Sequence, residues 1–230
     1  ERFAATGYPA ERIAAIQYGY DAQLFRPRTD EAPGRSPTVV MHGSFDQHHL
    51  GPIAFETVRL VHAAKPEVLF KFVGRKTPTL DSFATRIKGA CPNLKLELPG
   101  FVPYGEIAAH LAQATVGWIP YESSEGVHCA FVAKAVEYLG CGIPAASTPL
   151  ENLQRYFVDE PALRFSQFEP QSLAACLLYW LDMPEPKRRQ IGLAAAARVQ
   201  RELDWPVIAR RAVDFFEERT QPQTRTQGNR

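Results

Sequence analysis

The sequence predicts an α/β protein in which a parallel sheet carries helices on both faces. From residue 38 onward, apolar runs of strand length alternate with helical patterns, and the loops between them are short. Residues 38–42 form the first such run, and the apolar positions of residues 53–64 then recur every three or four residues, as on one face of a helix. Because parallel strands joined through helices use right-handed crossovers, repeated units of this kind give a Rossmann-like doubly wound sheet.

The later elements follow the same alternation. Glycine, proline or a polar loop ends each predicted strand, and a helical pattern follows it. We predict strands at residues 68–73, 94–98, 115–119, 143–147 and 162–165, and helices at residues 80–87, 106–114, 131–139, 150–157 and 171–181.

Composition and spacing divide the chain into four parts. Residues 1–37 are a leading segment and a linker rich in proline, and their first residues resemble the end of a helix, so we expect an N-terminal domain to be missing before them. Residues 38–183 form the Rossmann-like domain, and residues 184–218 form two C-terminal helices that break at a Trp-Pro pair. Residues 219–230 are polar without periodicity, so we predict a disordered tail.

Composition excludes several functional classes. The net charge of +1 offers no electrostatic basis for binding nucleic acid. The four cysteines are widely spaced without a CxxC pair, so we expect reduced thiols and no metal site. No apolar run reaches the ~18 residues of a membrane-spanning helix, and the sequence shows no signal-peptide pattern. We therefore expect a cytoplasmic protein, with the inner face of the membrane as a second location.

Residues 121–144 contain the strongest candidate site. Lys134 and Glu137 are three apart, so on a helix they share a face and direct their charges to one place. A polar loop at residues 121–128 precedes that helix, and such a loop offers free amides and the positive end of a helix dipole to a phosphate. GxGxxG and GxxxxGK[ST] are both absent, so the site is nucleotide-like without belonging to either standard type.

Several short motifs occur in a fixed order along the chain. The most specific is residues 134–144, which match KxxEYLAxGxP, and the others lie at Gly19, Asp21, Phe25 and Pro27, at residues 40–44, 72–74 and 100–102, and at Asp204, Trp205, Ile208 and Ala209. In this order and spacing they resemble the C-terminal, donor-binding domain of a GT-B glycosyltransferase of the group 1, or family 4, class. The resemblance covers nearly all of the chain except the tail, and it implies that residues 38–183 bind a nucleotide-sugar.

The resemblance implies roles for several residues. Glu137 would hold the ribose hydroxyls, which suits an ionised carboxylate because it can accept hydrogen bonds from both hydroxyls of a diol. Lys134 would either contact the donor diphosphate or pair with Glu137. The backbone groups expected at the phosphates are those of Ala130, Phe131 and Val132, and the residues expected at the base are Val102 and Tyr104. The alternative for Tyr104 is a role in packing alone.

The sequence departs from the family in the loop after the first strand. Many members carry Arg after the glycine of that strand, but here Ser44 follows Gly43, and no Lys follows within a few residues. The diphosphate charge would then be met by Arg75, Lys76 or Lys134, or chiefly by backbone groups. His48 and His49 lie in the same loop without a third ligand, so we expect no metal there.

A second departure lies in the loop before the central helix. The commonest form of the family has a glutamate eight residues before Glu137, touching the donor sugar, and this chain has Cys129 there. Glu125 and His128 are the candidates to contact the sugar instead. The alternative is that both belong to a solvated loop.

The resemblance implies a retaining glycosyltransferase that transfers a sugar from an NDP-sugar, of unspecified base and sugar, to an acceptor. The acceptor, a glycan, lipid or protein, would be held by the N-terminal acceptor domain, which would also supply part of the catalytic machinery. We expect no cofactor, and we expect this chain alone to bind nucleotide without catalysing transfer. One alternative is a non-catalytic, degenerate sugar-nucleotide-binding module that serves in interactions. A second is an unrelated Rossmann enzyme, such as an epimerase or methyltransferase.

Overall fold

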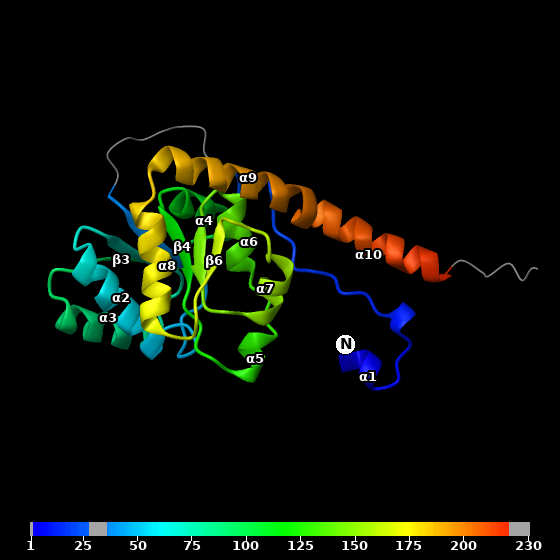
Figure 1. The fold of residues 1–230 in the computed structure, drawn as a ribbon, viewed down its shortest axis with the longest axis horizontal. Helices are drawn as coiled ribbons and strands as arrows, with labels where there is room; N and C mark the ends of the chain where they lie inside the picture. Colours follow the sequence, from blue (N-terminus) through cyan, green and yellow to red (C-terminus); the bar gives the residue numbers. More distant parts are fainter. Residues whose placement is uncertain (1, 28–35, 221–230) are drawn as a thin grey trace, which may run out of the picture.

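Six parallel strands form one sheet at the centre of the molecule (Figure 1). The computed structural model describes residues 2–27 and 36–220. The strand order is β3-β2-β1-β4-β5-β6, which is the doubly wound order of a Rossmann fold and confirms the predicted fold class. The strands are β1 (Thr38–His42), β2 (Leu69–Val73), β3 (Lys95–Gly100), β4 (Val116–Ile119), β5 (Ala145–Ser147) and β6 (Leu163–Phe165).

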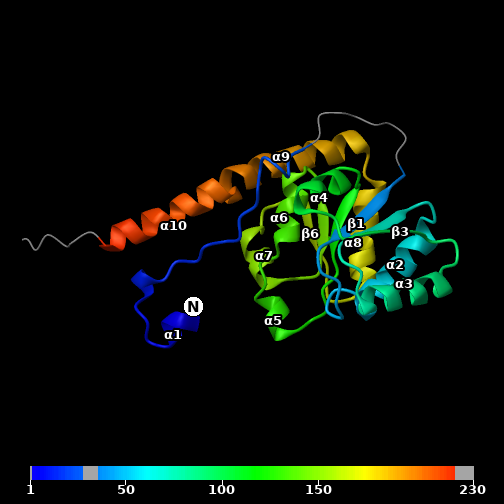
Figure 2. The ribbon, with the colours of Figure 1, turned by 180° about the vertical axis from the view of Figure 1, so that it is seen from behind.

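Helices cover both faces of this sheet (Figures 1 and 2). One face packs against α2 (Pro52–Ala64), α3 (Pro78–Ala90) and α8 (Pro170–Asp182). The other packs against α4 (Tyr104–Leu111), α6 (Ala133–Gly140), α7 (Glu151–Tyr156) and α9 (Glu185–Leu203). The remaining helices are α1 (Arg2–Ala5), the short η1 (Ala10–Arg12), α5 (Glu125–His128) and α10 (Trp205–Thr220).

The alternation of side chains along each strand creates these two cores. Val39 and Met41 of β1 pack on the side of α2 and α8, whereas Val40 packs on the side of α6. In β4 the small Gly117 leaves room for the ring of Tyr138 to lie against the strand, since a side chain there would overlap that ring. This close approach holds α6, and the charged residues on it, against the centre of the sheet.

Two predicted boundaries are wrong at the ends of the packed unit. The packed domain was predicted to begin at residue 38, yet Tyr20 and Phe25 of the leading segment are fully buried in the core beside α6 and α9. The Tyr20 amide donates to the carbonyl of Leu203, and the Ala22 amide donates to the carboxylate of Asp204, so contacts distant in sequence fix this segment. The predicted tail begins too early, because α10 continues to Thr220; residues 28–35 and 221–230 lie outside the described part.

α10 extends beyond the body of the molecule from the end of α9 (Figures 1 and 2). Near its C-terminal end, Arg219 donates a hydrogen bond to the carbonyl of Glu11, so the leading segment runs beside it. No helix in the described residues combines the length and apolarity required to cross a bilayer. The four cysteines are free thiols.

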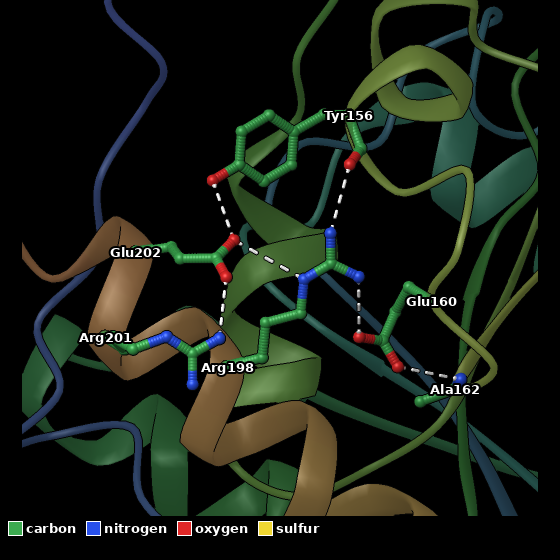
Figure 3. A network of polar contacts seen from close by, with 6 residues as sticks. All are labelled: Tyr156, Glu160, Ala162, Arg198, Arg201 and Glu202. Carbon is green, nitrogen blue, oxygen red and sulfur yellow. Dashed lines mark hydrogen bonds and ion pairs between the residues drawn. The ribbon is translucent and has the colours of Figure 1, made fainter.

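Arg198 ties α9 to the segment between α7 and β6 (Figure 3). Its guanidinium donates to the Glu160 carboxylate at 3.2 Å, to the Tyr156 carbonyl at 3.3 Å and to Glu202 at 3.4 Å. Glu160 is buried, and its second oxygen accepts from the Ala162 amide at 3.0 Å. Every charged group of this cluster is therefore compensated, as burial requires.

Replacing Arg198 with methionine should lower the free energy of unfolding by about 2 kcal/mol, because the buried Glu160 carboxylate loses its charge partner. Urea denaturation measures this change. Arg59→Met is the matched control, since Arg59 pairs with Glu56 on the surface, where such pairs contribute about 0–1 kcal/mol. Equal losses in the two variants would contradict the assigned role of the Arg198 cluster.

Candidate active site

The candidate site lies where the strands of the sheet end, as expected for an open parallel sheet. A cavity of about 460 Å³ opens there, with a mainly apolar wall. The loops after β1, β2 and β3 and the start of α4 line this cavity, with contributions from Gly43, Ser44, Gly74, Arg75, Val102 and Ile107. Its size and lining suit a flat aromatic group such as a nucleobase.

Two glycines bring the first two loops of the cavity into contact. Gly43 has φ +102°, a conformation that L side chains rarely adopt, and its amide donates to the Val73 carbonyl. A side chain at Gly74 would overlap the carbonyl oxygen of Gly43, so the two backbones touch directly. The absence of side chains at both positions leaves peptide groups facing the cavity.

Glu137 is a buried carboxylate at this edge of the sheet, with 5% of the residue exposed. One oxygen, Oε2, lies 2.5 Å from Nε2 of His42, and the other, Oε1, accepts from the Tyr104 hydroxyl at 3.2 Å. Burial lowers the pKa of His42, which keeps the imidazole neutral, and the short contact indicates that its single proton is on Nε2. Burial also raises the pKa of Tyr104, so this hydroxyl remains a donor.

Lys134 supplies a buried ammonium one helical turn before Glu137. It donates to the Tyr121 hydroxyl at 2.9 Å, and a side chain at Gly43 would come into contact with it. Burial lowers the pKa of Lys134 to about 8, with the charges of Glu137 and Asp46 opposing that shift. The described residues contain no direct ion pair between Lys134 and Glu137, and both side chains are buried rather than on the surface of the helix.

His48 and His49 lie in different surroundings. His49 is buried, packs edge-on against Tyr121 and shares a 2.7 Å hydrogen bond with Asp46, whereas His48 is exposed. Burial, followed by the charge of Lys134, lowers the pKa of His49. Among residues 2–27 and 36–220, no group of three or more potential ligands is placed to hold a metal ion.

The N-terminus of α2 is occupied by a carboxylate from the chain itself. Glu122, which follows β4, accepts from the Ile53 amide at 2.7 Å, and a side chain at Gly51 would overlap it. The amide of Glu122 in turn donates to the His48 carbonyl. In many Rossmann proteins the first crossover helix meets a phosphate here, so this position is not open to one in this chain.

The N-terminus of α6 remains as the place where amides can meet a phosphate. The prediction for Ala130 is wrong, because its amide donates to the Val127 carbonyl at the end of α5. The amides of Phe131 and Val132 have no hydrogen-bond acceptor in the described part of the chain. They precede the first turn of α6, where the helix dipole favours an anion.

Glu125 and His128, which were predicted to contact the sugar, make their contacts away from Glu137. The predicted loop of residues 121–128 contains the single helical turn α5, capped by Ser124. Glu125 is exposed in that turn, while His128 lies 3.3 Å from the Ser123 hydroxyl and packs on Phe168. Neither shares a hydrogen bond with Lys134 or Glu137 in the described residues.

The two cations of the loop after β2 also separate. Arg75 lines the cavity, whereas Lys76 is exposed and is not part of the cavity wall. Lys134 is thus the buried cation of the site, and Arg75 is an exposed cation at its margin.

Sequence reasoning missed His42, Tyr121 and Glu122 as members of this site. His42 carried a usable signal, because it is a polar residue at the end of an otherwise apolar buried strand. Tyr121 and Glu122 carried none, since their partners Lys134 and Ile53 lie far away or in another element.

Comparison with known proteins adds a family to this geometry. Residues 55–214 match the model of a family described as glycosyl transferase-like, which is more than half of the chain. The chain belongs to this family. Membership favours a glycosyltransferase over the non-catalytic module and over the epimerase or methyltransferase alternatives.

One curated relative of this glycosyl transferase-like chain is WcaL of Salmonella typhimurium, which is named as a colanic acid biosynthesis glycosyltransferase. The two sequences are 25% identical over 152 residues, which cover 64% of this chain and 36% of WcaL. The chain therefore spans about a third of the length of that relative.

Solved structures share the fold. Sucrose-phosphate synthase from Thermosynechococcus elongatus gives a TM-score of 0.71 at 23% identity, over 88% of this chain and 51% of the synthase. Anabaena Alr3699/HepE in complex with UDP gives 0.75 at 17% identity, over 94% and 60% of the two chains. The C-terminal domain of the group 1 glycosyl transferase LpcC from Francisella tularensis gives 0.67 at 15% identity, over 81% of this chain and 100% of that domain. The glycosyl transferase-like chain thus has the Rossmann-like architecture of one half of a GT-B fold.

Proposed function

We propose that this chain is the donor-binding half of a retaining glycosyltransferase that uses an NDP-sugar. The observation that carries the proposal is the pair of buried charges on α6, Glu137 and Lys134, placed beside Gly43 and next to an apolar cavity. The base would occupy the cavity, the ribose would bind Glu137, and the diphosphate would meet Lys134 and the amides before α6. The complex of Alr3699/HepE with UDP supports a nucleotide ligand for this fold.

In the proposed reaction, the bond between the anomeric carbon and the diphosphate oxygen breaks, and the leaving NDP takes the electron pair. Negative charge grows on the diphosphate as this happens. Lys134 and the amides of Phe131 and Val132 lie where they would stabilise that charge. The acceptor hydroxyl forms the new bond to the anomeric carbon and gives up its proton to the leaving diphosphate. Retention of the anomeric configuration follows from the family resemblance.

The proposal includes a second domain and an acceptor. The chain spans 51–60% of the synthase and HepE chains that it matches, which supports an additional acceptor-binding domain in the working enzyme. Exposed apolar side chains on the leading segment and α10, among them Tyr8, Ile16 and Val213, offer that domain a surface. The acceptor would be a glycan, lipid or protein, the enzyme would act in the cytoplasm, and this chain alone would bind the donor without transferring the sugar.

Calorimetric titration of the chain with UDP, GDP and ADP tests the proposed function. We expect saturable binding of one of the three, which also identifies the base. Uridine, guanosine and adenosine serve as controls, and the matching nucleoside should bind far more weakly because it lacks the diphosphate. A folded chain that binds none of the three nucleotides would contradict the proposal.

The affinity for that nucleoside diphosphate should fall above pH 8. The ammonium of Lys134 must be charged to meet the diphosphate, and burial lowers its pKa to about 8 in the free protein. Since the bound diphosphate favours the charged form, the dissociation constant should be level below pH 8 and rise about tenfold per pH unit above it. Lys134→Met should bind more weakly and lose this step. A wild-type dissociation constant that stays level to pH 9.5 would exclude Lys134 as the diphosphate partner.

A further inference from the structure

Both oxygens of the Glu137 carboxylate already have a hydrogen-bond partner in the absence of a ligand. His42 holds Oε2 at 2.5 Å and the Tyr104 hydroxyl donates to Oε1 at 3.2 Å. A ribose that binds Glu137 therefore approaches a group whose two oxygens both have partners. Each carboxylate oxygen can accept two hydrogen bonds, so a ribose hydroxyl either shares an oxygen with one of these partners or takes that partner's place.

The two partners differ in how firmly the fold holds them. His42 ends a central strand, is 3% exposed, packs edge-on against the Tyr138 ring at 5.0 Å and donates its amide to the Tyr138 hydroxyl. Of its two ring nitrogens, Nε2 bonds to Glu137, and Nδ1 has no hydrogen-bond partner in the described residues. Glu137 is therefore the hydrogen-bond partner of the ring. Because burial and two contacts with Tyr138 hold it in place, His42 is the fixed partner.

Tyr104 is the exchangeable partner. It is the first residue of α4 and is 52% exposed, and its ring is held by an edge contact with Phe25 at 5.4 Å. Its 3.2 Å contact with Oε1 is long for a hydroxyl that donates to a carboxylate, for which about 2.5–2.7 Å is usual. The hydroxyl can turn away to solvent without leaving a buried group unsatisfied on the tyrosine itself.

The position of Tyr104 is also where a ribose would have to lie. Gly43 lines the apolar cavity, lies beside Lys134 and directly follows His42, so it joins the three parts of the site. In the proposed complex, the base lies in the cavity and the diphosphate lies at Lys134. The ribose between them would then lie over Gly43, on the side of Glu137 that faces the cavity loops. Phe101 and Val102 line the cavity, and Tyr104, two residues further along the chain, reaches to Oε1.

From these contacts we infer that Tyr104 is a gate, whose hydroxyl occupies on Glu137 Oε1 the place of a ribose hydroxyl and leaves when the donor binds. His42 is the positioning residue that keeps the carboxylate in place during this exchange. The inference rests on the proposed function and adds a ribose-dependent step to it. It also explains why a half-exposed tyrosine points its hydroxyl inward in the free protein.

Removing Tyr104 or His42 as a partner of Glu137 should change the nucleotide affinity in opposite directions. Tyr104→Phe keeps the ring and its contact with Phe25 but removes the competing hydroxyl, so the affinity for whichever of UDP, GDP and ADP binds should rise about 3- to 10-fold. His42→Leu removes the fixed donor and should weaken the same binding at least 10-fold. His42→Gln, whose amide can still donate, should recover most of the loss, and thermal melts of each variant establish that it is folded.

The 2′,3′-dideoxy form of the same nucleoside diphosphate isolates the ribose step. It has no hydroxyl to exchange with Tyr104, so its affinity should be equal in the wild type and in Tyr104→Phe. Tyr179→Phe is the matched control, because Tyr179 is exposed on α8 and its ring contacts Arg164 and Trp180 outside the site.

The outcomes separate the gate from the function on which it rests. Two results would overturn the gate while leaving the donor site intact. In the first, the wild type binds the nucleotide and Tyr104→Phe binds it equally well or more weakly. In the second, Tyr104→Phe gains affinity for the dideoxy nucleotide as well. No binding of any nucleotide by the folded wild type would overturn the proposed function, and the gate with it.

Discussion

Gly192→Ala should lower the free energy of unfolding by about 3 kcal/mol or more, although the same change inside a helix ordinarily raises it by up to about 1 kcal/mol. Gly192 lies in α9, and a side chain there would overlap the carbonyl group of Gly142. Gly142 has φ +72°, so its peptide cannot move aside without strain. The new methyl group therefore meets rigid backbone and must push α9 away from α6.

Gly89→Ala is the matched control for this prediction. Gly89 is also helical, in α3, but a side chain at this position would have no neighbour within 4 Å. We expect Gly89→Ala to be neutral or to stabilise the protein by up to about 1 kcal/mol. Urea denaturation of both variants decides the matter, and a stabilised Gly192→Ala would show that α9 does not need its close contact with Gly142.

Glu137→Ala should reduce the affinity for the bound nucleoside diphosphate at least 100-fold. Two hydrogen bonds from a ribose to a charged carboxylate contribute about 1.5–3 kcal/mol each, and every 1.4 kcal/mol corresponds to a factor of ten in affinity. Calorimetric titration with UDP, GDP and ADP measures the loss. Glu106→Ala provides the control, because Glu106 is exposed in the first turn of α4 and should bind as the wild type does.

The alanine variant also leaves the Nε2 proton of buried His42 without an acceptor, which should cost about 1–3 kcal/mol of stability. A melting curve must therefore accompany each titration. Glu137→Gln retains an oxygen for His42 and should fold more stably while still losing most of the affinity, since the charge is gone. Nucleotide affinity that survives in both variants would remove Glu137 from the ribose site.

The fold could be predicted because its signals are local. Each strand is a short apolar run, such as residues 38–42, and each long helix carries a periodic apolar face, such as α2. The single turn α5 escaped prediction because four residues are too few for a helical period to appear. The burial of Tyr20 also escaped it, because Tyr20 pairs with Leu203 at the far end of the chain and local pattern contains no trace of that contact.

The candidate site could likewise be predicted only in part from the sequence. Lys134 and Glu137 were accessible from their spacing, since residues three apart on a helix share a face. Their actual partners were not, because His42, Tyr104 and Tyr121 come from three other elements that only the folded sheet brings together. The amide of Ala130 shows the reverse case, in which a short turn consumed a group that the sequence left free.

Glu122 places a carboxyl group of the chain itself at the start of its first crossover helix. A sheet with this strand order offers two neighbouring helix ends at the place where its winding reverses, and here one of them is satisfied before any ligand arrives. Restoring a glycine-rich fingerprint after β1 would thus not be enough to turn the protein into a dinucleotide binder, because the carboxylate would compete with the incoming pyrophosphate for the Ile53 amide. Glu122 thus closes the N-terminus of α2 to an external phosphate and leaves the N-terminus of α6 for one.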